Sequence, residues 1–428
     1  MSWIKKNIAL TFAIIYCVII NEFTLVFFTI DNSIDGLSLL AIRALNLIVI
    51  LIGGAISKNY VGKNFLKNFL IIFLMSVFLF TVLNTAFVYY SPKLVKLFPT
   101  NIVRSISPCY RTMFHRNEEK LLNVNYVFGD SFSEGAGEEF LNGDDEYGIF
   151  NKLRNIDSNE LIFGRGGYGN IGTLLEFEHC FPLLSTYTTL GTSKIENYHV
   201  TFVFYEGNDL NNNLLEKDRE FSELKYNLRF FFPLYEYTYK MIWSLSRKFF
   251  RRLAGNMNTS NNIENTSNNI KKSSTYPVST SGIQLNLYPQ SAATELTDSE
   301  LNESLTLFFN TLKTIKRILP ASDSYMVLYL PAVASSYSFQ GDLLVQSYFG
   351  YEFHTTTGEF NSERHEFIVD TVRSEAQSLG WAFCDVTREI LNQTDKGIAV
   401  HGPRDWKHFN KAGYTVVARF YEKCLRTM

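Results

Sequence analysis

The chain carries a serine and, more than 270 residues later, an aspartate and a histidine, the side chains that nucleophilic catalysis requires. Ser131 follows a predicted strand, 124–129, so we expect its hydroxyl at the carboxyl end of that strand. His408 lies three residues after Asp405, a spacing that lets the carboxylate reach the imidazole within one turn. A serine hydroxyl is a weak nucleophile until an imidazole takes its proton, and a carboxylate orients that imidazole. These residue types therefore predict a nucleophile, a general base and the acid that orients the base.

Two other segments carry N–H groups that could bind a developing oxyanion. The run 164–170, GRGGYGN, contains four glycines, which permit tight turns and close approach of backbone N–H groups to a ligand oxygen. Its glycine spacing does not match the dinucleotide fingerprint G-x-G-x-x-G. Asn208 follows a later predicted strand, where its amide could face the same ligand. Preset donors of this kind stabilise the tetrahedral intermediate of acyl transfer.

The elements that would position these residues begin at residue 123. From there, short apolar runs alternate with helical stretches, which is typical of a parallel α/β sheet. The predicted strands are 124–129, 160–164, 198–205, 324–331 and 380–386. The predicted helices are 145–155, 170–182, 298–318, 362–378 and 411–426. Thr297 and Asn410 are the residue types that cap helix amino termini, and each directly precedes a predicted helix.

The order of the chemical groups along the chain is what favours a site. Taken singly, Gly, Asp, Asn and Ser are common turn residues, and a lone histidine is usually a surface residue. Here the serine follows the first strand, the glycines follow the second and the asparagine follows the third, while the Asp/His pair precedes the last helix. Parallel strands end at one edge of a sheet, so we expect all four groups to converge there.

These motifs together resemble the conserved blocks of the SGNH/GDSL hydrolase family. The matching segments are GDS at 129–131, GRGGYGN at 164–170, GND at 207–209 and D-x-x-H-x-N-x-x-G at 405–413. They occur in the family's order and span about 120–428. The resemblance implies a three-layer α/β/α, flavodoxin-like domain with a five-stranded parallel sheet.

The resemblance also implies a role for each site residue. Ser131 corresponds to the nucleophile, His408 to its general base and Asp405 to the residue that orients the base. The oxyanion hole would consist of the Ser131 and Gly167 backbone N–H groups and the Asn208 side chain. The chain departs from the family pattern in two places, because Phe132 replaces a leucine and Arg165 interrupts the glycine block. The family's usual asparagine is also missing from that block.

Three apolar runs at the start of the chain predict a membrane segment, 1–90. The runs 7–30, 37–56 and 69–90 are each long enough to cross a bilayer as a helix. Lysines precede the first run and fill the loop between the second and third runs, whereas the loop between the first two runs carries aspartates. By the positive-inside rule, the lysine-rich ends lie in the cytoplasm. We therefore expect a multi-pass protein of the cytoplasmic membrane with a cytoplasmic amino terminus. Everything after Tyr90 would lie outside the cytoplasm.

Two charges lie within these spans, Glu22 and Arg43. They could pair across the helix hairpin, or each could reach the interface separately. After the spans, 91–122 reads as a connector and 123–428 as the hydrolase domain.

An insertion, 210–297, interrupts the alternation of strands and helices in that domain. Within it, 254–282 has the polar composition of a disordered segment. The aromatic stretch 228–253 could lie on the membrane surface or pack over the active-site cleft.

Composition excludes several partners and sites. The formal net charge of −2 gives no electrostatic reason to expect nucleic acid as a partner. No C-x-x-C pair occurs, so a thiolate zinc site is not expected, and the motifs imply no metal or cofactor. A disulfide could form in an oxidising compartment, although the sequence leaves its pairing open. The four cysteines after residue 90 are Cys109, Cys180, Cys384 and Cys424.

The sequence thus predicts a membrane-anchored serine esterase acting on an ester, such as an O-acetyl group, of a cell-envelope glycan or lipid. An O-acetyltransferase that modifies an extracytoplasmic polysaccharide, supplied by a membrane acyl-donor partner, would use the same residues. A non-catalytic glycan-binding protein on this fold is the third alternative.

Overall fold

The computed structural model describes part of the domain that follows the predicted membrane segment. The described residues are 123–137, 159–164, 166–189, 197–217, 276–277, 284–285, 289–320, 322–339, 341–346, 353–402 and 405–428. They belong to one of the two compact units of the chain, Arg111–Tyr226 together with Glu264–Met428. Several predicted segments lie outside the described residues: 7–30, 37–56, 69–90, 91–122, 145–155 and 228–253. Of the segment 254–282, expected to be disordered, only β4 (Tyr276–Pro277) is described, and it pairs with β5 (Gln284–Leu285). In the part that is described, no helix combines the length and apolar character that a bilayer span requires.

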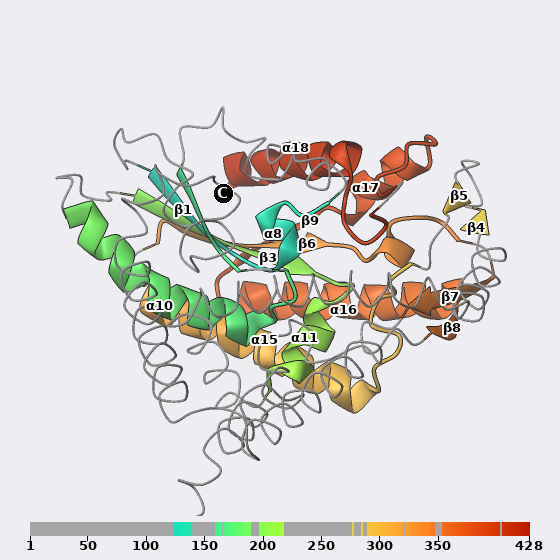
Figure 1. Cartoon of the computed structure of the whole chain (residues 1–428), viewed down its shortest axis with the longest axis horizontal. Coiled ribbons are helices and arrows are strands. Elements are labelled where there is room, and N and C mark those ends of the chain that lie inside the picture. Colours follow the sequence, from blue (N-terminus) through green and yellow to red (C-terminus); the bar gives the residue numbers. More distant parts are fainter. Residues whose placement is uncertain are drawn as a thin grey trace, which may run out of the picture. The chain divides into compact units, whose positions relative to one another are not determined.

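A five-stranded parallel sheet in the order β2-β1-β3-β6-β9 forms the centre of the domain (Figure 1). Its strands are β1 (Asn123–Phe128), β2 (Asn159–Phe163), β3 (Asn197–Tyr205), β6 (Ser324–Leu330) and β9 (Ala382–Asp385). All five predicted strands are confirmed, with ends shifted by at most two residues. Strands covered on both faces are apolar on both faces, which explains why continuous apolar runs predicted them.

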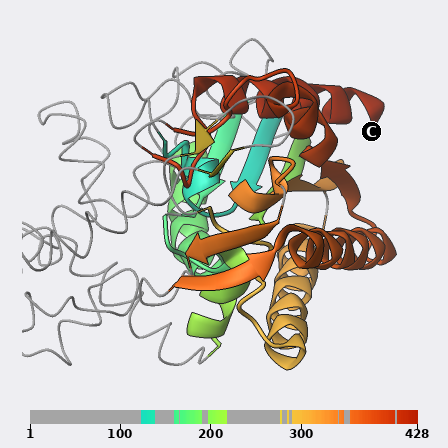
Figure 2. The ribbon, with the colours of Figure 1, turned by 90° about the vertical axis from the view of Figure 1, so that its right-hand side faces the viewer.

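Helices cover both faces of this sheet and make three layers. Their bounds are α10 (Asn170–Thr189), α11 (Asp209–Leu215), α15 (Asp298–Ile318), α16 (Gly358–Ser378), α17 (Thr387–Thr394) and α18 (Lys411–Thr427). Figures 1 and 2 show α18 on one side of the sheet and α10, α15 and α16 on the other. The four predicted helices in the described part are confirmed, and α10 and α16 are longer than predicted.

The alternation of side chains along each strand builds a separate core on each face. Val127 and Val203 point to one face, where they pack in a cluster with Tyr414 and Tyr421 of α18. Neighbouring residues point the other way. The Phe128 ring lies 5.1 Å from the Phe177 ring of α10, and the Phe204 ring lies 4.7 Å from the Phe308 ring of α15. Burial of these rings fixes the strand register, because a slip of one residue would exchange the two faces.

Both predicted helix caps are present. The Thr297 hydroxyl accepts the Glu300 N–H at 3.3 Å, and the Glu300 carboxylate accepts the Thr297 N–H at 2.9 Å, which completes a capping box. The Asn410 side chain accepts the N–H groups of the residues at positions 412 and 413 at the start of α18. This second cap fixes the chain two residues after His408.

Some elements were not predicted. A hairpin of β7 (Asp342–Gln346) and β8 (Phe353–Thr357) follows the fourth strand of the sheet, and α11 occupies the predicted start of the insertion 210–297. Three consecutive asparagines in α11 are poor helix formers. Their side-chain amides instead donate to groups far along the chain, as when Asn213 donates to the Ser304 carbonyl at 3.3 Å. Tertiary contacts therefore stabilise α11 where local propensity does not.

A disulfide joins Cys384 in β9 to Cys424 in α18. It links the edge strand of the sheet to the last helix across a sequence separation of 40 residues. The pairing that the sequence left open is thereby assigned for these two cysteines.

Breaking this disulfide is expected to lower the free energy of unfolding by about 2–4 kcal/mol, because it removes a loop constraint from the unfolded chain. The comparison is wild type against the Cys384→Ala/Cys424→Ala variant in denaturant titrations without reductant. Since Cys180 is also disulfide-bonded, a titration with reductant should destabilise wild type more than the double variant. Equal stability of the two proteins without reductant would contradict a structural role for the bond.

Candidate active site

Three side chains form a continuous hydrogen-bonded chain at the carboxyl edge of the sheet. His408 Nε2 lies 2.8 Å from the Ser131 Oγ, although the two residues are 277 positions apart. His408 Nδ1 lies 2.7 Å from Asp405 Oδ2. The other carboxylate oxygen of Asp405 accepts the backbone N–H groups of Lys407 and His408, at 3.0 and 3.2 Å. The structure therefore brings together all three residues that the sequence predicted for this role.

The charge of Asp405 decides the tautomer of His408. Burial acts to raise the pKa of Asp405, but the His408 hydrogen bond and the backbone N–H groups outweigh it, and the pKa falls to about 2. An ionised carboxylate only accepts hydrogen bonds, so His408 Nδ1 must carry the proton in this contact. Nε2 of the neutral ring is then an acceptor, and it faces the Ser131 hydroxyl. This is the state in which an imidazole can act as a base toward serine.

The turn that presents Ser131 depends on its two preceding residues. Gly129 has a φ of 154°, and a Cβ there would lie 2.9 Å from the Val203 carbonyl oxygen, so only glycine fits. Asp130 caps the short helix α8 (Ser131–Glu134), with its carboxylate accepting the Phe132 N–H at 2.9 Å. Its second oxygen lies 3.2 Å from the Ser131 Oγ. Burial raises the pKa of Asp130, while the Phe132 N–H, the His408 charge and the Asn208 side chain oppose the shift.

The glycine-rich loop after β2 approaches Ser131 closely. A Cβ on Gly164 would overlap the carbonyl group of Gly129, and a Cβ on Gly166 would lie 3.3 Å from the Ser131 Cβ. The Gly166 N–H donates to the Glu134 carboxylate at 3.0 Å. Gly167, the predicted oxyanion donor, follows with a φ of 80°. The loop thus brings backbone to within contact of the serine, as four glycines in the sequence suggested.

Asn208 lies at the carboxyl end of β3, at the N-cap position of α11, without capping that helix. Its side chain lies close enough to the Asp130 carboxyl group to lower the pKa of Asp130. The side-chain amide oxygen of Asn208 is buried and has no hydrogen-bond partner within the described ranges. The Asn208 side chain therefore lies beside the turn that carries Ser131.

Aromatic and polar contacts that the sequence did not predict hold the His408 loop. The Phe132 ring lies 5.1 Å from the His408 ring and 4.0 Å from the Tyr205 ring. The Tyr337 hydroxyl accepts two backbone N–H groups, at positions 400 and 401, and lies 3.1 Å from His401 Nδ1. Burial lowers the pKa of His401 to about 3, so this histidine is neutral and serves packing. No local pattern marks Tyr337, because its partners lie more than 60 residues away.

A second carboxylate–imidazole pair lies behind this edge of the sheet. His365 Nδ1 of α16 lies 2.7 Å from Glu206 Oε1, and the other Glu206 oxygen accepts the Ala332 N–H at 2.8 Å. Burial disfavours the charge on both side chains, but their mutual attraction outweighs it. The pKa of Glu206 is lowered and that of His365 is raised. No local sequence pattern marks this pair, whose members are 159 positions apart.

The His365→Gln substitution is expected to lower the free energy of unfolding more in acidic to neutral solution than in alkaline solution. Because the folded-state pKa of His365 is raised above 6.5, its pairing stabilises the fold fully below that value and less as the pH rises through the folded pKa. The free energy difference from wild type should therefore shrink as the pH rises above 6.5 and through the raised folded-state pKa, measured by denaturant titration. In a Glu206→Gln background the pH dependence should disappear. A difference that stays constant with pH in both backgrounds would contradict the pairing.

Among the residues with described positions, no group of three or more His, Cys, Asp and Glu is arranged to hold a metal ion. No protein-family model matches this chain, and no curated protein matches it.

Proposed function

We propose that the chain is a serine esterase of the SGNH/GDSL hydrolase type that works through an acyl-enzyme. The observation that carries this proposal is the hydrogen-bonded chain from Ser131 Oγ through His408 to Asp405, at 2.8 and 2.7 Å. Nucleophile, base and orienting acid stand within hydrogen-bond reach of one another, which is the geometry that nucleophilic catalysis by serine requires. The predicted oxyanion donors Asn208 and Gly167 follow β3 and β2, at the same edge of the sheet.

The reaction proceeds in two balanced steps. Ser131 Oγ attacks the ester carbonyl carbon while its proton passes to His408 Nε2, and the oxyanion receives hydrogen bonds from the predicted donors. His408 then gives this proton to the leaving alcohol, and the acyl group stays on Ser131. In the second step His408 takes a proton from water, the hydroxide attacks the acyl-enzyme, and the carboxylic acid leaves as the proton returns to Ser131. Asp405 stays ionised and stabilises the imidazolium in both steps.

The substrate in this proposal is an ester, such as an O-acetyl group, of a cell-envelope glycan or lipid. The predicted spans 7–30, 37–56 and 69–90 would anchor the domain outside the cytoplasmic membrane, with the amino terminus in the cytoplasm. The Cys384–Cys424 disulfide supports this location, because disulfides persist mainly in oxidising compartments.

A second function, O-acetyl transfer to a polysaccharide hydroxyl, would pass through the same acyl-enzyme. A bound sugar hydroxyl would then replace water in the second step, with a membrane partner as the acyl donor. The same residues serve both reactions.

One assay on the full-length protein tests the proposal and separates the two reactions. The protein is first incubated with a fluorophosphonate probe, which should label Ser131. A separate portion of the protein, never exposed to the probe, is given p-nitrophenyl acetate with and without chitopentaose, and free acetate and acetylated sugar are quantified. Acetate alone indicates an esterase, and acetylated sugar indicates a transferase. A folded protein that neither reacts with the probe nor releases p-nitrophenol would instead be a non-catalytic glycan-binding protein.

A further inference from the structure

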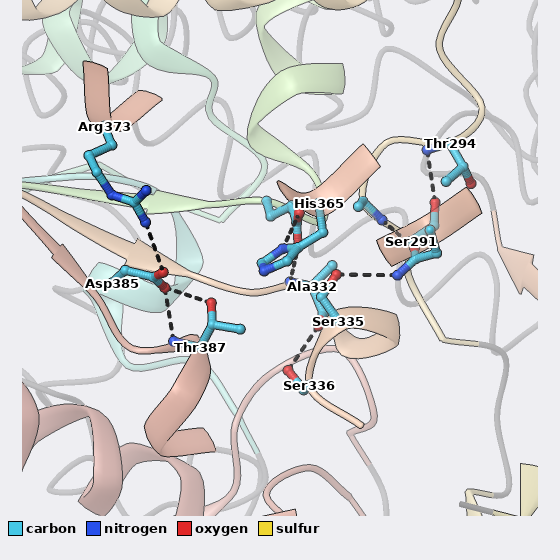
Figure 3. A network of polar contacts seen from close by, with 12 residues as sticks. Ser291, Thr294, Ala332, Ser335, Ser336, His365, Arg373, Asp385 and Thr387 are labelled. Carbon is cyan, nitrogen blue, oxygen red and sulfur yellow. Dashed lines mark hydrogen bonds and ion pairs between the residues drawn. The ribbon is translucent and has the colours of Figure 1, made fainter. Parts of the chain in front are cut away.

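A cavity of about 740 Å³ lies beside the carboxyl ends of β6 and β9, between α16, the segment 334–339 and the start of α17. Figure 3 labels five of the polar residues that line it, Ser335, His365, Arg373, Asp385 and Thr387. Its lining does not include Ser131, Asp405 or His408. The volume falls within the range of about 300–1,000 Å³ that small-molecule sites occupy.

Several of the charged groups that line this cavity are paired with one another. Arg373 donates to Asp370 at 2.6 Å, and its other terminal nitrogen lies 3.9 Å from Asp385. Asp385 also accepts the N–H and the hydroxyl of Thr387, at 2.9 and 2.6 Å. His365 forms an ion pair with Glu206, which does not itself line the cavity. Besides His365, two arginines and four carboxylates line the cavity. The excess of carboxylates disfavours an anionic ligand.

The lining nevertheless offers directed hydrogen-bonding groups. Glu206 engages only Nδ1 of His365, so Nε2 of this lining residue remains for a ligand. The carboxylates accept hydrogen bonds, and the Arg373 guanidinium donates them in a fixed plane. The rings of Tyr337 and Phe339, 6.0 Å apart, add apolar surface. A ligand that carries many hydroxyl groups on a C–H framework matches this mixture of charged and aromatic groups.

A fatty acyl chain fits this lining poorly. It would remove water from Arg373, Asp385 and His365 without supplying hydrogen bonds, and burying such groups without partners is costly. The cavity therefore favours a sugar over a lipid tail as its occupant.

We propose that this cavity binds uncharged sugar residues of the glycan whose ester reaches Ser131. This inference rests on the proposed function and chooses the glycan over the lipid as the substrate class. Two features connect the cavity with the Ser131 site. Glu206, the partner of the lining residue His365, lies two positions before Asn208 in the chain. Tyr337, which lines the cavity, accepts the N–H groups of positions 400 and 401, in the segment that precedes the Asp405–His408 pair.

The test blocks the cavity without touching the Ser131 site. Ser362 is an exposed residue of α16 that lines the cavity, so Ser362→Trp should fill part of it. Ser374 is an exposed residue of the same helix outside the lining, and Ser374→Trp is the matched control. The full-length proteins are titrated with chitopentaose, cellopentaose, mannopentaose, pentagalacturonate and decanoate.

Wild type should bind at least one of the three neutral oligosaccharides, and more tightly than pentagalacturonate or decanoate. Ser362→Trp should weaken that binding by about tenfold or more, equivalent to ~1.4 kcal/mol, while Ser374→Trp leaves it unchanged. Both variants should keep the wild-type thermal midpoint and the wild-type turnover of p-nitrophenyl acetate, a substrate too small to need the cavity.

The inference is overturned if wild type binds none of the neutral probes, or if Ser362→Trp binds them as wild type does. Preferred binding of pentagalacturonate or decanoate in the cavity would also overturn it. Failure of the proposed function has a different signature: wild type would not turn over p-nitrophenyl acetate or react with fluorophosphonate, whatever the sugar titrations give.

Discussion

The Ser131→Ala variant is expected to hydrolyse p-nitrophenyl acetate about 10⁴- to 10⁶-fold more slowly than wild type, with kcat carrying the loss. The variant keeps the fold and the oxyanion donors but has no oxygen to form the acyl-enzyme. His408→Ala should be about as slow, since an unassisted serine hydroxyl is a poor nucleophile. The double variant should be no slower than either single variant, because the two groups act in one step.

Ser133 offers a matched control on the same turn. Its hydroxyl donates to the Asp130 carbonyl oxygen, which also accepts the Glu134 N–H. Ser133→Ala should therefore keep that carbonyl paired and change turnover little. Wild-type rates from Ser131→Ala, or additive losses in the Ser131→Ala/His408→Ala protein, would contradict the assignment of nucleophile and base.

Asp405→Asn is expected to lower kcat by about 10⁴-fold through the tautomer of His408. An asparagine amide facing Nδ1 can donate a hydrogen bond, which favours a proton on Nε2 of the neutral ring and leaves no acceptor for the Ser131 hydroxyl. The pKa of Asp405 in the folded protein is about 2, so the wild-type carboxylate stays ionised in neutral and mildly acidic solution. Its stabilising contribution is lost only as the pH falls through that value. The loss of kcat should therefore persist across roughly pH 5–9.

The measurement is kcat on p-nitrophenyl acetate with nitrogen NMR of the His408 ring. The ring should carry its proton on Nδ1 in wild type and on Nε2 in the variant. Asp323→Asn changes an exposed carboxylate that precedes β6, at the opposite edge of the sheet, and should leave both readouts unchanged. Unaltered kcat in Asp405→Asn would show that Asp405 does not orient the base.

The sequence by itself determined the frame of the domain. Strands such as β3 and β6 are buried on both faces, so their residues form a continuous apolar run. Such a run can be recognised in the sequence without knowing which strands lie beside it. Thr297 and Asn410 are capping residues whose partners lie within three positions, so the starts of α15 and α18 could be read locally. The same holds for the Asp405–His408 spacing, because the two side chains meet across three residues.

The meeting of distant residues was decided by the tertiary structure alone. The sequence indicates which side chains could face Ser131, but whether they contact it depends on the order of the strands in the sheet. The Cys384–Cys424 and Glu206–His365 pairs carry no local mark, and neither does the contact of Tyr337 with the backbone of residues 400–401. Helix α11 formed against the propensity of its asparagines for the same reason. Local patterns record which face of an element is buried, whereas partners far apart in the chain are chosen only when the whole sheet and its helices pack.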